Sequence, residues 1–542
     1  MLLLGDILRK HAHPRLFGRK TALIWGNEAW TYSTLNSQVN RLANGLLALG
    51  VAKGDRVAVL GRNCVEYVVC YFALAKLGAI MVPVNFWYRA GEVRYTLDQS
   101  GSTWLLVGAQ FNAIAAEAAD MLEKTTLRAA VCWGHTGGPV AWIGSSQTRQ
   151  VSYSDLLAGA ADSEPDVDLT PDDPHIILYT SGTTGFPKGA LFSHRAHYLH
   201  AMAWVIRTRT VEEDVGQLVY PLFHTGGPDC VLLPHFLVGA TVLLLDGADP
   251  AEMLDTAARW RATSLFCVPT VWRRALGQMR RRSYDVSSVR RCLGSSDTFT
   301  PDLLDEILGR FPADVYVTYG LTEAGCILTF SRLTRDDRAR IGTVGKPHPL
   351  VEVRLVDSAD QDVPPGEVGE VVARGPTLMD GYWQLPEKTA EAMRGGWLHS
   401  GDSARADDEG FLYIAGRLKD LIISGGENIY PIEIERLLRQ HPGVREVAIV
   451  GVPDAEWSES VLAAVVPTAE WLPHCNGEPA GAAAELKAFV RRQVAGFKTP
   501  RYVEFVEALP VTTATNKVQK AVLRERYGEH CLAMSQQRVG QQ

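Results

Sequence analysis

The sequence predicts an α/β fold: a large N-terminal α/β domain of several subdomains with a β-rich portion, followed by a small α+β domain. At 542 residues the chain is long for one hydrophobic core, because domains average roughly 150 residues. From Trp30 onward, apolar runs of strand length alternate with apolar residues at helical spacing, which is typical of a largely parallel sheet covered by helices. Beyond residue 416, alternating apolar strands and further helices indicate a separate small unit.

Three segments near the N-terminus illustrate the assignment. Residues 67–84 read as a helix that runs into a buried strand, and Lys76 and Pro83 make this segment fall short of a membrane span. Residues 134–174 are rich in Gly, Ser, Asp and Pro and lack sustained periodicity, so we predict a surface connection there. Between two short strands, a helix is predicted from apolar residues at helical spacing, namely Leu35, Val39, Leu42, Leu46 and Leu47.

Composition and charge argue against several classes of protein. The net charge of −7 and the lack of a basic block make nucleic acid an unexpected partner. The 9 cysteines show no C-x-x-C spacing, so we expect neither a zinc site nor a disulfide framework, which fits a cytoplasmic protein. The N-terminus lacks the apolar core of a signal peptide. The spacing of His194, His197 and His200 spreads them over too wide an arc for one metal ion.

A glycine-rich loop, YTSGTTGFPKGA at residues 179–190, follows a short apolar strand. Gly182 and Gly185 remove side-chain bulk where the backbone approaches a ligand, and Lys188 adds a mobile positive charge. Amides, hydroxyls and a cation in one small volume suit phosphate oxygens, although the Walker A spacing is absent. Taken alone, the loop is equally explained by turn chemistry. The hydroxyls belong to Ser181, Thr183 and Thr184.

This loop resembles the phosphate loop of the adenylate-forming superfamily, which contains acyl-CoA synthetases, luciferases and peptide-synthetase adenylation domains. Further motifs follow in the order of that family up to Lys517, and the resemblance is nearest to fatty-acyl-CoA synthetases. The resemblance implies that ATP and AMP bind to Thr180, Ser181, Gly182, Thr183, Thr184, Lys188, Gly294, Ser295, Ser296, Tyr319, Gly320, Thr322, Asp402 and Arg417. It implies catalytic roles for Lys517, Thr184, Glu323 and His224.

The second strong motif, YGLTEAG at residues 319–325, supplies three kinds of contact. Tyr319 offers a flat face for adenine, and Thr322 a hydroxyl for the α-phosphate. Glu323 supplies the hard carboxylate oxygen that Mg²⁺ prefers. Alone, a Thr-Glu pair after glycine is also an ordinary helix start.

A third cluster reaches from residue 366 to 431. Asp402 is suited to accept hydrogen bonds from both ribose hydroxyls, and Arg417 has a forked side chain for ribose or phosphate.

The resemblance also places an acid pocket. Amino-acid-activating relatives carry an aspartate where His224 stands, so a counter-charge for an α-ammonium group is missing here. Asp229 and Asp297 leave open a substrate that bears polar groups, although aspartates are more often solvated or cap helices. The expected pocket residues are His224, Thr225, Gly226, Val268, Asp297 and Leu321.

The family organisation implies an N-terminal domain over residues 1–416, a hinge at 417–419 that pivots on Lys419, and a mobile domain over 420–530. We expect the chain after Tyr527 to be unstructured, and we assign residues 531–542 to a tail. A coenzyme A tunnel is implied at Ser424, Gly425 and Gly426. Lys517 takes the position of the family's lysine, and Asn516 takes the position of the glycine before it. Lys517 is expected to stabilise charge at the α-phosphate.

The implied function is that of an acyl-CoA ligase with ATP, Mg²⁺ and coenzyme A. A hydrophobic, non-amino carboxylic acid is converted to acyl-AMP with release of pyrophosphate, and the acyl group then passes to coenzyme A. The alternatives are transfer to a separate carrier protein or partner ligase, luciferase-like oxidation, and a catalytically weak nucleotide-binding protein. The identity of the acid is not readable from the sequence, and a homodimer is the default expectation.

Overall fold

The computed structural model describes residues 2–124, 127–134, 148–180, 187–295, 299–334, 340–424, 427–512 and 518–539. The chain forms two compact units. The first comprises Met1–Val353 and Val372–His399, and the second comprises Arg354–Val371 and Ser400–Gln542. The units do not divide at residue 416, and the predicted hinge at 417–419 stays a prediction. None of the described helices is long and apolar enough to cross a bilayer.

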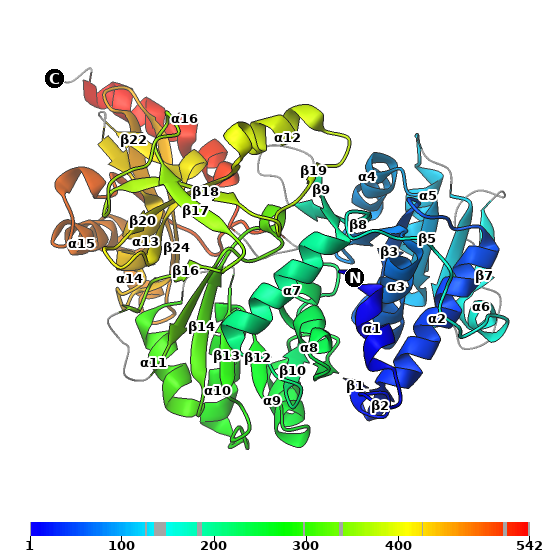
Figure 1. The fold of residues 1–542 in the computed structure, drawn as a ribbon. Coiled ribbons are helices and arrows are strands. Elements are labelled where there is room, and N and C mark those ends of the chain that lie inside the picture. The colour runs from blue at the N-terminus through cyan, green and yellow to red at the C-terminus, as the bar shows by residue number, and fades with distance from the viewer. Residues whose placement is uncertain are drawn as a thin grey trace. The chain divides into compact units, whose positions relative to one another are not determined.

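An 8-stranded sheet forms one half of the first unit (Figure 1). From β8 to β7 neighbouring strands pair in parallel, as predicted, whereas β8, β9 and β19 pair antiparallel. In order of pairing, the strands are β19 (Gly381–Tyr382), β9 (Lys188–Ser193), β8 (Pro174–Thr180), β4 (Ile80–Val84), β3 (Arg56–Leu60), β5 (Trp104–Gly108), β6 (Ala129–Trp133) and β7 (Arg149–Ser152).

A 9-stranded sheet forms the other half of this unit. Its strands from β14 to β1 pair in parallel, and β2, β15 and β16 are antiparallel additions at its edges. In order of pairing, the strands are β16 (Lys346–Pro347), β15 (Thr329–Leu333), β14 (Asp314–Tyr319), β13 (Arg291–Gly294), β12 (Ser264–Phe266), β10 (Val215–Leu218), β11 (Thr241–Leu244), β1 (Thr21–Trp25) and β2 (Glu28–Thr31).

Helices bury one apolar face against each sheet. Helices α10 and α11 lie beside the strands of the 9-stranded sheet (Figure 1). Trp272 and Leu276 of α10 pack with Ile307 of α11 in its core, and the Trp272 indole donates to the Leu293 carbonyl at 3.1 Å. The helices of this unit are α1 (Gly5–His11), α2 (Tyr32–Leu49), α3 (Val65–Leu77), α4 (Ala90–Ser100), α5 (Asn112–Asp120), α6 (Tyr153–Ala158), α7 (His194–Thr208), α8 (Leu233–Leu237), α9 (Pro250–Arg259), α10 (Pro269–Arg281), α11 (Pro301–Arg310) and α12 (Pro386–Ala392).

The side-chain amide of Asn63 links the two sheets at the ends of their strands. It follows β3 and is buried, and its nitrogen donates to the carbonyls of Tyr220 at 2.8 Å and Leu245 at 2.9 Å. Its oxygen accepts from the backbone N–H of Leu222 at 2.8 Å. Because three backbone groups near the ends of β10 and β11 depend on one amide, Asn63 fixes the alignment of the two sheets.

The second unit contains the sheet β23 (Glu427–Ile429), β22 (Ile422–Ser424), β25 (Ser458–Pro467), β24 (Val444–Asp454), with β26 (Tyr502–Phe505) paired to β25. Val447 and Ile449 pack toward α13 (Pro431–Leu438) and α15 (Pro479–Arg491), while the alternate residues Ala448 and Val450 pack on the other face. This alternation confirms the predicted strand pattern, since successive side chains of a strand point to opposite faces. The remaining short helix is α14 (Leu472–Gly477).

Two expectations about irregular segments were wrong. Residues 528–539 are not unstructured: they belong to α16 (Lys520–Val539), and Cys531 and Ser535 are fully buried. Leu523, the partly buried Tyr527, Cys531 and Ser535 are spaced four residues apart, so the helix packs with one face against the sheet. The predicted surface connection at 134–174 contains β7 and α6. Ser152 starts α6, because its hydroxyl accepts a hydrogen bond from the Asp155 N–H.

The first unit buries several uncharged histidines. His194 and His197 on α7 pack beside His175, and His197 also contacts the ring of Phe192. Burial lowers the pKa of His194, His235 and His348 to about 4 and that of His197 to about 3. The protein interior therefore uses these rings as neutral packing groups.

This burial makes stability depend on pH below the ordinary histidine pKa of about 6.5. Between about pH 6.5 and pH 4 the unfolded chain takes up protons that the folded chain does not, so stability falls as pH falls. We expect a loss of about 1 kcal/mol or more per pH unit, measured by chemical denaturation from about pH 7 to pH 5.

His197→Gln should reduce this slope, whereas His13→Gln, at an exposed position, serves as the control and should leave it unchanged. Stability that is constant or rises on acidification over this range would contradict the burial of neutral histidines.

Candidate active site

The hairpin of β8 and β9 brings Thr180 and Lys188 together. The two residues pair directly across the hairpin, and the Thr180 hydroxyl donates to the Lys188 carbonyl at 3.4 Å. Strand pairing thus fixes the two residues on either side of the predicted loop, Thr180 at the end of β8 and Lys188 at the start of β9. Thr180 is at the carboxyl end of its strand, and open α/β sheets bind ligands at the carboxyl ends of their strands.

Lys188 and Glu323 are joined through a tyrosine. The Lys188 ammonium lies 4.3 Å from the centre of the Tyr382 ring, which is a cation–π contact. The Tyr382 hydroxyl donates to Glu323 Oε1 at 2.7 Å. Burial and the neighbouring Glu323 carboxylate raise the pKa of Tyr382, so the hydroxyl keeps its proton and donates. A cation and a carboxylate from two sheets therefore meet around one aromatic ring.

The backbone around Tyr382 fixes this arrangement. β19 pairs with β9, and the Trp383 N–H donates to the Gly189 carbonyl at 2.8 Å. The N–H of Met379 donates to the Glu323 carbonyl at 2.9 Å. The segment 379–383 is thus bonded to the hairpin that carries Lys188 and to the turn that carries Glu323.

The second motif forms a tight turn at the end of β14. Tyr319 ends the strand, and the turn of 3₁₀-helix η3 (Thr322–Ala324) holds Thr322 and Glu323. A Cβ atom at Gly320 would lie 2.1 Å from the Cys326 carbonyl oxygen, so only glycine fits where the turn closes on itself. Leu321 lies between these residues and its carbonyl accepts from the N–H groups of Ala324 and Cys326.

Four described residues of the predicted acid pocket follow β10 and β12 in the chain, namely His224, Thr225, Gly226 and Val268. Gly226 donates its N–H to His224 Nδ1 at 3.1 Å, and Thr225 is buried beside them. Val268 directly precedes α10. Gly294 and Ser295, predicted to bind the nucleotide, lie at the end of β13 and just after it. After Gly227, a turn of π-helix η2 (Pro228–Leu232) carries Cys230, whose sulfur lies 3.3 Å from that of Cys326.

Asp229 differs from the expectation of a solvated or capping aspartate. It is fully buried, and its Oδ1 lies 3.3 Å from His197 Nδ1. Burial raises the pKa of Asp229 well above its ordinary value and so favours the uncharged carboxyl. The Asp229 carboxyl is therefore enclosed by protein and not solvated.

Asp402 and Arg417 lie in the second unit. They pair across β20 (Leu398–Ala406) and β21 (Leu412–Arg417), within a 4-stranded sheet with β17 (Glu352–Val356) and β18 (Val368–Arg374). Arg417 Nε lies 3.3 Å from Asp402 Oδ1. The predicted pair is thus brought together, with the arginine 44% exposed.

Lys419 lies in the 3₁₀-turn Leu418–Asp420, and its carbonyl accepts from Arg524 at 3.5 Å. Ser424 ends β22. The remaining predicted site residues lie outside the described residues, namely Ser181, Gly182, Thr183, Thr184, Ser296, Asp297, Gly425, Gly426 and Lys517.

Sequence reasoning missed Tyr382, Cys230 and Cys326. Tyr382 lies 59 residues after Glu323 and 96 residues separate the two cysteines, so no local spacing connects these partners. The aromatic residue beside a glycine in the DGYW stretch was the available signal.

The fold and the site define an adenylate-forming enzyme with a large N-terminal and a small C-terminal domain. The sequence model of the family described as AMP-binding enzyme matches residues 10–383, and that of the AMP-binding enzyme C-terminal domain matches residues 433–517. The chain belongs to the AMP-binding enzyme family.

Named relatives match over almost the whole chain. A feruloyl-CoA synthase of Amycolatopsis sp. is 38% identical over 95% of this chain and 97% of its own length. A fatty acid–[acyl-carrier-protein] ligase, ScoC of Streptomyces coeruleorubidus, is 32% identical over 93% of its length and 93% of this chain. Among solved structures, the anthranilate CoA ligase AuaEII in complex with anthranoyl-AMP superposes with a TM-score of 0.86 at 29% identity, covering 97% of this chain and 98% of that one. The predicted superfamily, the fold and the enzyme class of AMP-forming acid–thiol ligases are confirmed.

The hydroxyl of Tyr382 gives a direct test of the site. Tyr382→Phe keeps the ring beside Lys188 but removes the hydrogen bond to Glu323, and bonds to a charged group contribute about 1.5–3 kcal/mol. We expect ATP–pyrophosphate exchange to slow about tenfold or more and to require more Mg²⁺.

Tyr95→Phe is the matched control, because the Tyr95 hydroxyl donates to the Pro187 carbonyl at 2.9 Å and not to Glu323. If the two variants exchange pyrophosphate equally well, the proposed role of the Tyr382–Glu323 bond is wrong.

Proposed function

We propose that this enzyme activates a non-amino carboxylic acid with a hydrophobic body as an acyl adenylate, releases pyrophosphate, and then transfers the acyl group to coenzyme A. The observation that carries the proposal is the contact of Lys188 and Glu323 around Tyr382. A cation and a carboxylate at the end of a strand hairpin suit MgATP, whose phosphates need both a positive charge and a metal ligand.

In the first half-reaction a carboxylate oxygen of the acid attacks the α-phosphorus of ATP, and the bond to pyrophosphate breaks. We assign Lys188 to neutralising phosphate charge and the Thr322 hydroxyl to donating to an α-phosphate oxygen. We assign Lys517 to stabilising the charge that develops as pyrophosphate leaves.

The residues present fit a magnesium ion. Tyr382 uses Glu323 Oε1 as an acceptor, which orients the carboxylate and leaves Oε2 as a hard ligand. When bound, Mg²⁺ supplies positive charge to the phosphates.

In the second half-reaction the thiol of coenzyme A attacks the acyl carbonyl and AMP leaves. The full-length relative named feruloyl-CoA synthase supports coenzyme A as acceptor. We further propose Lys419 as the hinge and Ser424, Gly425 and Gly426 as the coenzyme A tunnel. Two features support an acid without an α-ammonium group: His224 stands where amino-acid-activating relatives carry an aspartate, and burial of Asp229 raises its pKa.

A second candidate acceptor is a separate carrier protein. The relative named fatty acid–[acyl-carrier-protein] ligase favours it, because it matches this chain over 93% of its length. The two candidates differ only in the last step, so the products separate them.

Pyrophosphate release from MgATP should be measured over a panel of carboxylic acids, with and without coenzyme A, and the products identified by mass. We expect acid-dependent pyrophosphate and an acyl-CoA product. Acyl-AMP that accumulates regardless of coenzyme A would instead favour the carrier protein, and no acid-dependent pyrophosphate at all would refute the proposal.

Lys517→Ala should separate the half-reactions. We expect adenylation to fall by at least about a hundredfold, because one charge that stabilises the transition state is lost. Supplied acyl-AMP should still react with coenzyme A at nearly the normal rate. An equal loss in both half-reactions would remove Lys517 from the adenylation step.

A further inference from the structure

Two cysteine thiols connect the segment of the predicted acid pocket with the second motif. The sulfur of Cys230 lies 3.3 Å from that of Cys326, although 96 residues separate them in the sequence. Cys230 lies on the π-helical turn η2, which follows the segment of His224 and Gly226. Cys326 directly follows Gly325, the last residue of the second motif. All 9 cysteines are free, so Cys230 and Cys326 form a reduced thiol pair.

Cys326 is the more reactive member of the thiol pair. It is partly exposed, whereas Cys230 is fully buried. A hydrogen bond from the Cys230 thiol lowers the pKa of Cys326, and one from the Thr225 hydroxyl acts in the same direction against the effect of burial. In Cys64, the other partly exposed cysteine, burial and the Glu66 carboxylate raise the pKa. Because the thiolate is the nucleophile, an oxidant reacts first with Cys326.

The backbone at Cys326 is strained. Its φ of 92° lies in a region that residues other than glycine seldom adopt, and its N–H donates to the Leu321 carbonyl at 3.1 Å. Cys230 also lies on irregular backbone, since π-helical turns are rare and occur frequently at functional sites. Strained backbone collects at active sites and switch regions. Both members of the thiol pair thus lie on backbone of a kind that marks functional positions.

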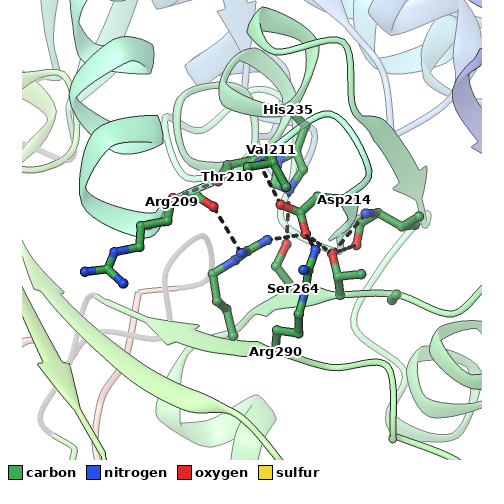
Figure 2. A network of polar contacts seen from close by, with 12 residues as sticks. Arg209, Thr210, Val211, Asp214, His235, Ser264 and Arg290 are labelled. Atoms are coloured by element: carbon green, nitrogen blue, oxygen red, sulfur yellow. Dashed lines mark hydrogen bonds and ion pairs between the residues drawn. The ribbon is translucent and has the colours of Figure 1, made fainter.

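The turn η2, which carries Cys230, is anchored to the 9-stranded sheet. The Val231 carbonyl lies 2.7 Å from Nδ1 of His235, and Nε2 of the same ring lies 3.1 Å from the Ser264 hydroxyl on β12. Figure 2 shows the contact of His235 with Ser264 in the polar network around Asp214. Because η2 has this anchor, an approach of the two sulfurs displaces mainly Cys326 and the turn before it.

We propose that the thiol pair is a redox modification site, at which hydrogen peroxide converts Cys230 and Cys326 to a disulfide. A partly exposed, reactive cysteine beside a second cysteine is typical of redox sensors. This site is separate from the proposed ligase chemistry, which uses neither sulfur.

The oxidation proceeds in two steps. The Cys326 thiolate attacks one oxygen of the peroxide, the O–O bond breaks, and the departing hydroxide becomes water by taking up the proton that Cys326 had lost. Cys326 is then a sulfenic acid. The sulfur of Cys230 attacks the sulfur of Cys326, the S–O bond breaks, and the hydroxyl leaves with the Cys230 proton as a second water. The two thiols lose two electrons, and the peroxide gains them.

The disulfide changes the geometry of the candidate active site. Its sulfurs lie about 2.05 Å apart, so those of Cys230 and Cys326 approach by roughly 1.3 Å from their separation of 3.3 Å. The turn before Cys326 carries Thr322 and Glu323, and a displacement of about 1 Å in an active site can slow a reaction about a hundredfold. We therefore expect oxidation to slow adenylation. This consequence rests on the proposed function, whereas formation of the disulfide does not.

The test treats the reduced full-length enzyme with hydrogen peroxide and follows two quantities. Mass analysis of proteolytic fragments should find the fragments of Cys230 and Cys326 linked, with the loss of two hydrogen atoms. Acid-dependent pyrophosphate release should fall about tenfold or more and should return when dithiothreitol reduces the disulfide.

Two variants separate the disulfide from other oxidation, each compared with the same variant without peroxide. Cys230→Ala should form no disulfide, and its Cys326 should stop at the sulfenic acid, which dimedone traps. Cys326→Gly suits the φ of 92° and therefore serves if Cys230→Ala does not fold by thermal denaturation. Its pyrophosphate release should be insensitive to the peroxide. Cys64→Ser is the control, because Cys64 is partly exposed but outside the thiol pair, and it should respond as the wild type does.

The outcomes separate this inference from the proposed function. If peroxide links no fragments of Cys230 and Cys326 in the wild type, or if Cys326→Gly loses as much activity as the wild type, the inference is overturned. A disulfide that leaves pyrophosphate release unchanged would overturn its effect on the site. If the reduced enzyme releases no pyrophosphate with any acid, the proposed function fails, and the fragment masses still decide whether the disulfide forms.

Discussion

The bond between the Tyr382 hydroxyl and Glu323 is the interaction on which the candidate active site depends. It joins an element of the 8-stranded sheet to the turn that ends β14 of the 9-stranded sheet, and the ring of the same tyrosine lies beside Lys188. Residues 354–371 belong to the second unit, and the chain then returns to the first unit over residues 372–399. This returning segment contributes the two residues of β19, Gly381 and Tyr382. The positions of the Lys188 cation and the Glu323 carboxylate therefore depend on it.

The sequence predicted those helices and strands whose apolar residues recur with the period of the element. The strand before the glycine-rich loop, the helix over 32–49 and the alternation along β24 and β25 were all readable, because burial there repeats with the period of the element. The helix that begins at Lys520 was missed because the face it packs, formed by Leu523, the partly buried Tyr527, Cys531 and Ser535, ends in a polar residue. The Tyr382 contact and the cysteine contact were not predictable, since each joins segments that are distant in sequence.

Several buried polar groups inside the first unit are paired or uncharged. Asn63 makes three hydrogen bonds, Lys76 donates to Asn36, Asn40 and Glu164, and the pKa of His197 is lowered by burial. Such groups are paired or discharged because an unpaired charge in the interior is costly.

The central claim is that the acid attacks the α-phosphorus of ATP and that AMP then leaves with one of the acid's oxygens. It is tested most directly with an acid labelled with oxygen-18 in both carboxylate positions, followed by mass analysis of the nucleotide and thioester products. The account predicts that AMP gains one labelled oxygen and that the thioester keeps the other. Unlabelled AMP, or label found in inorganic phosphate with ADP as the nucleotide product, would contradict it.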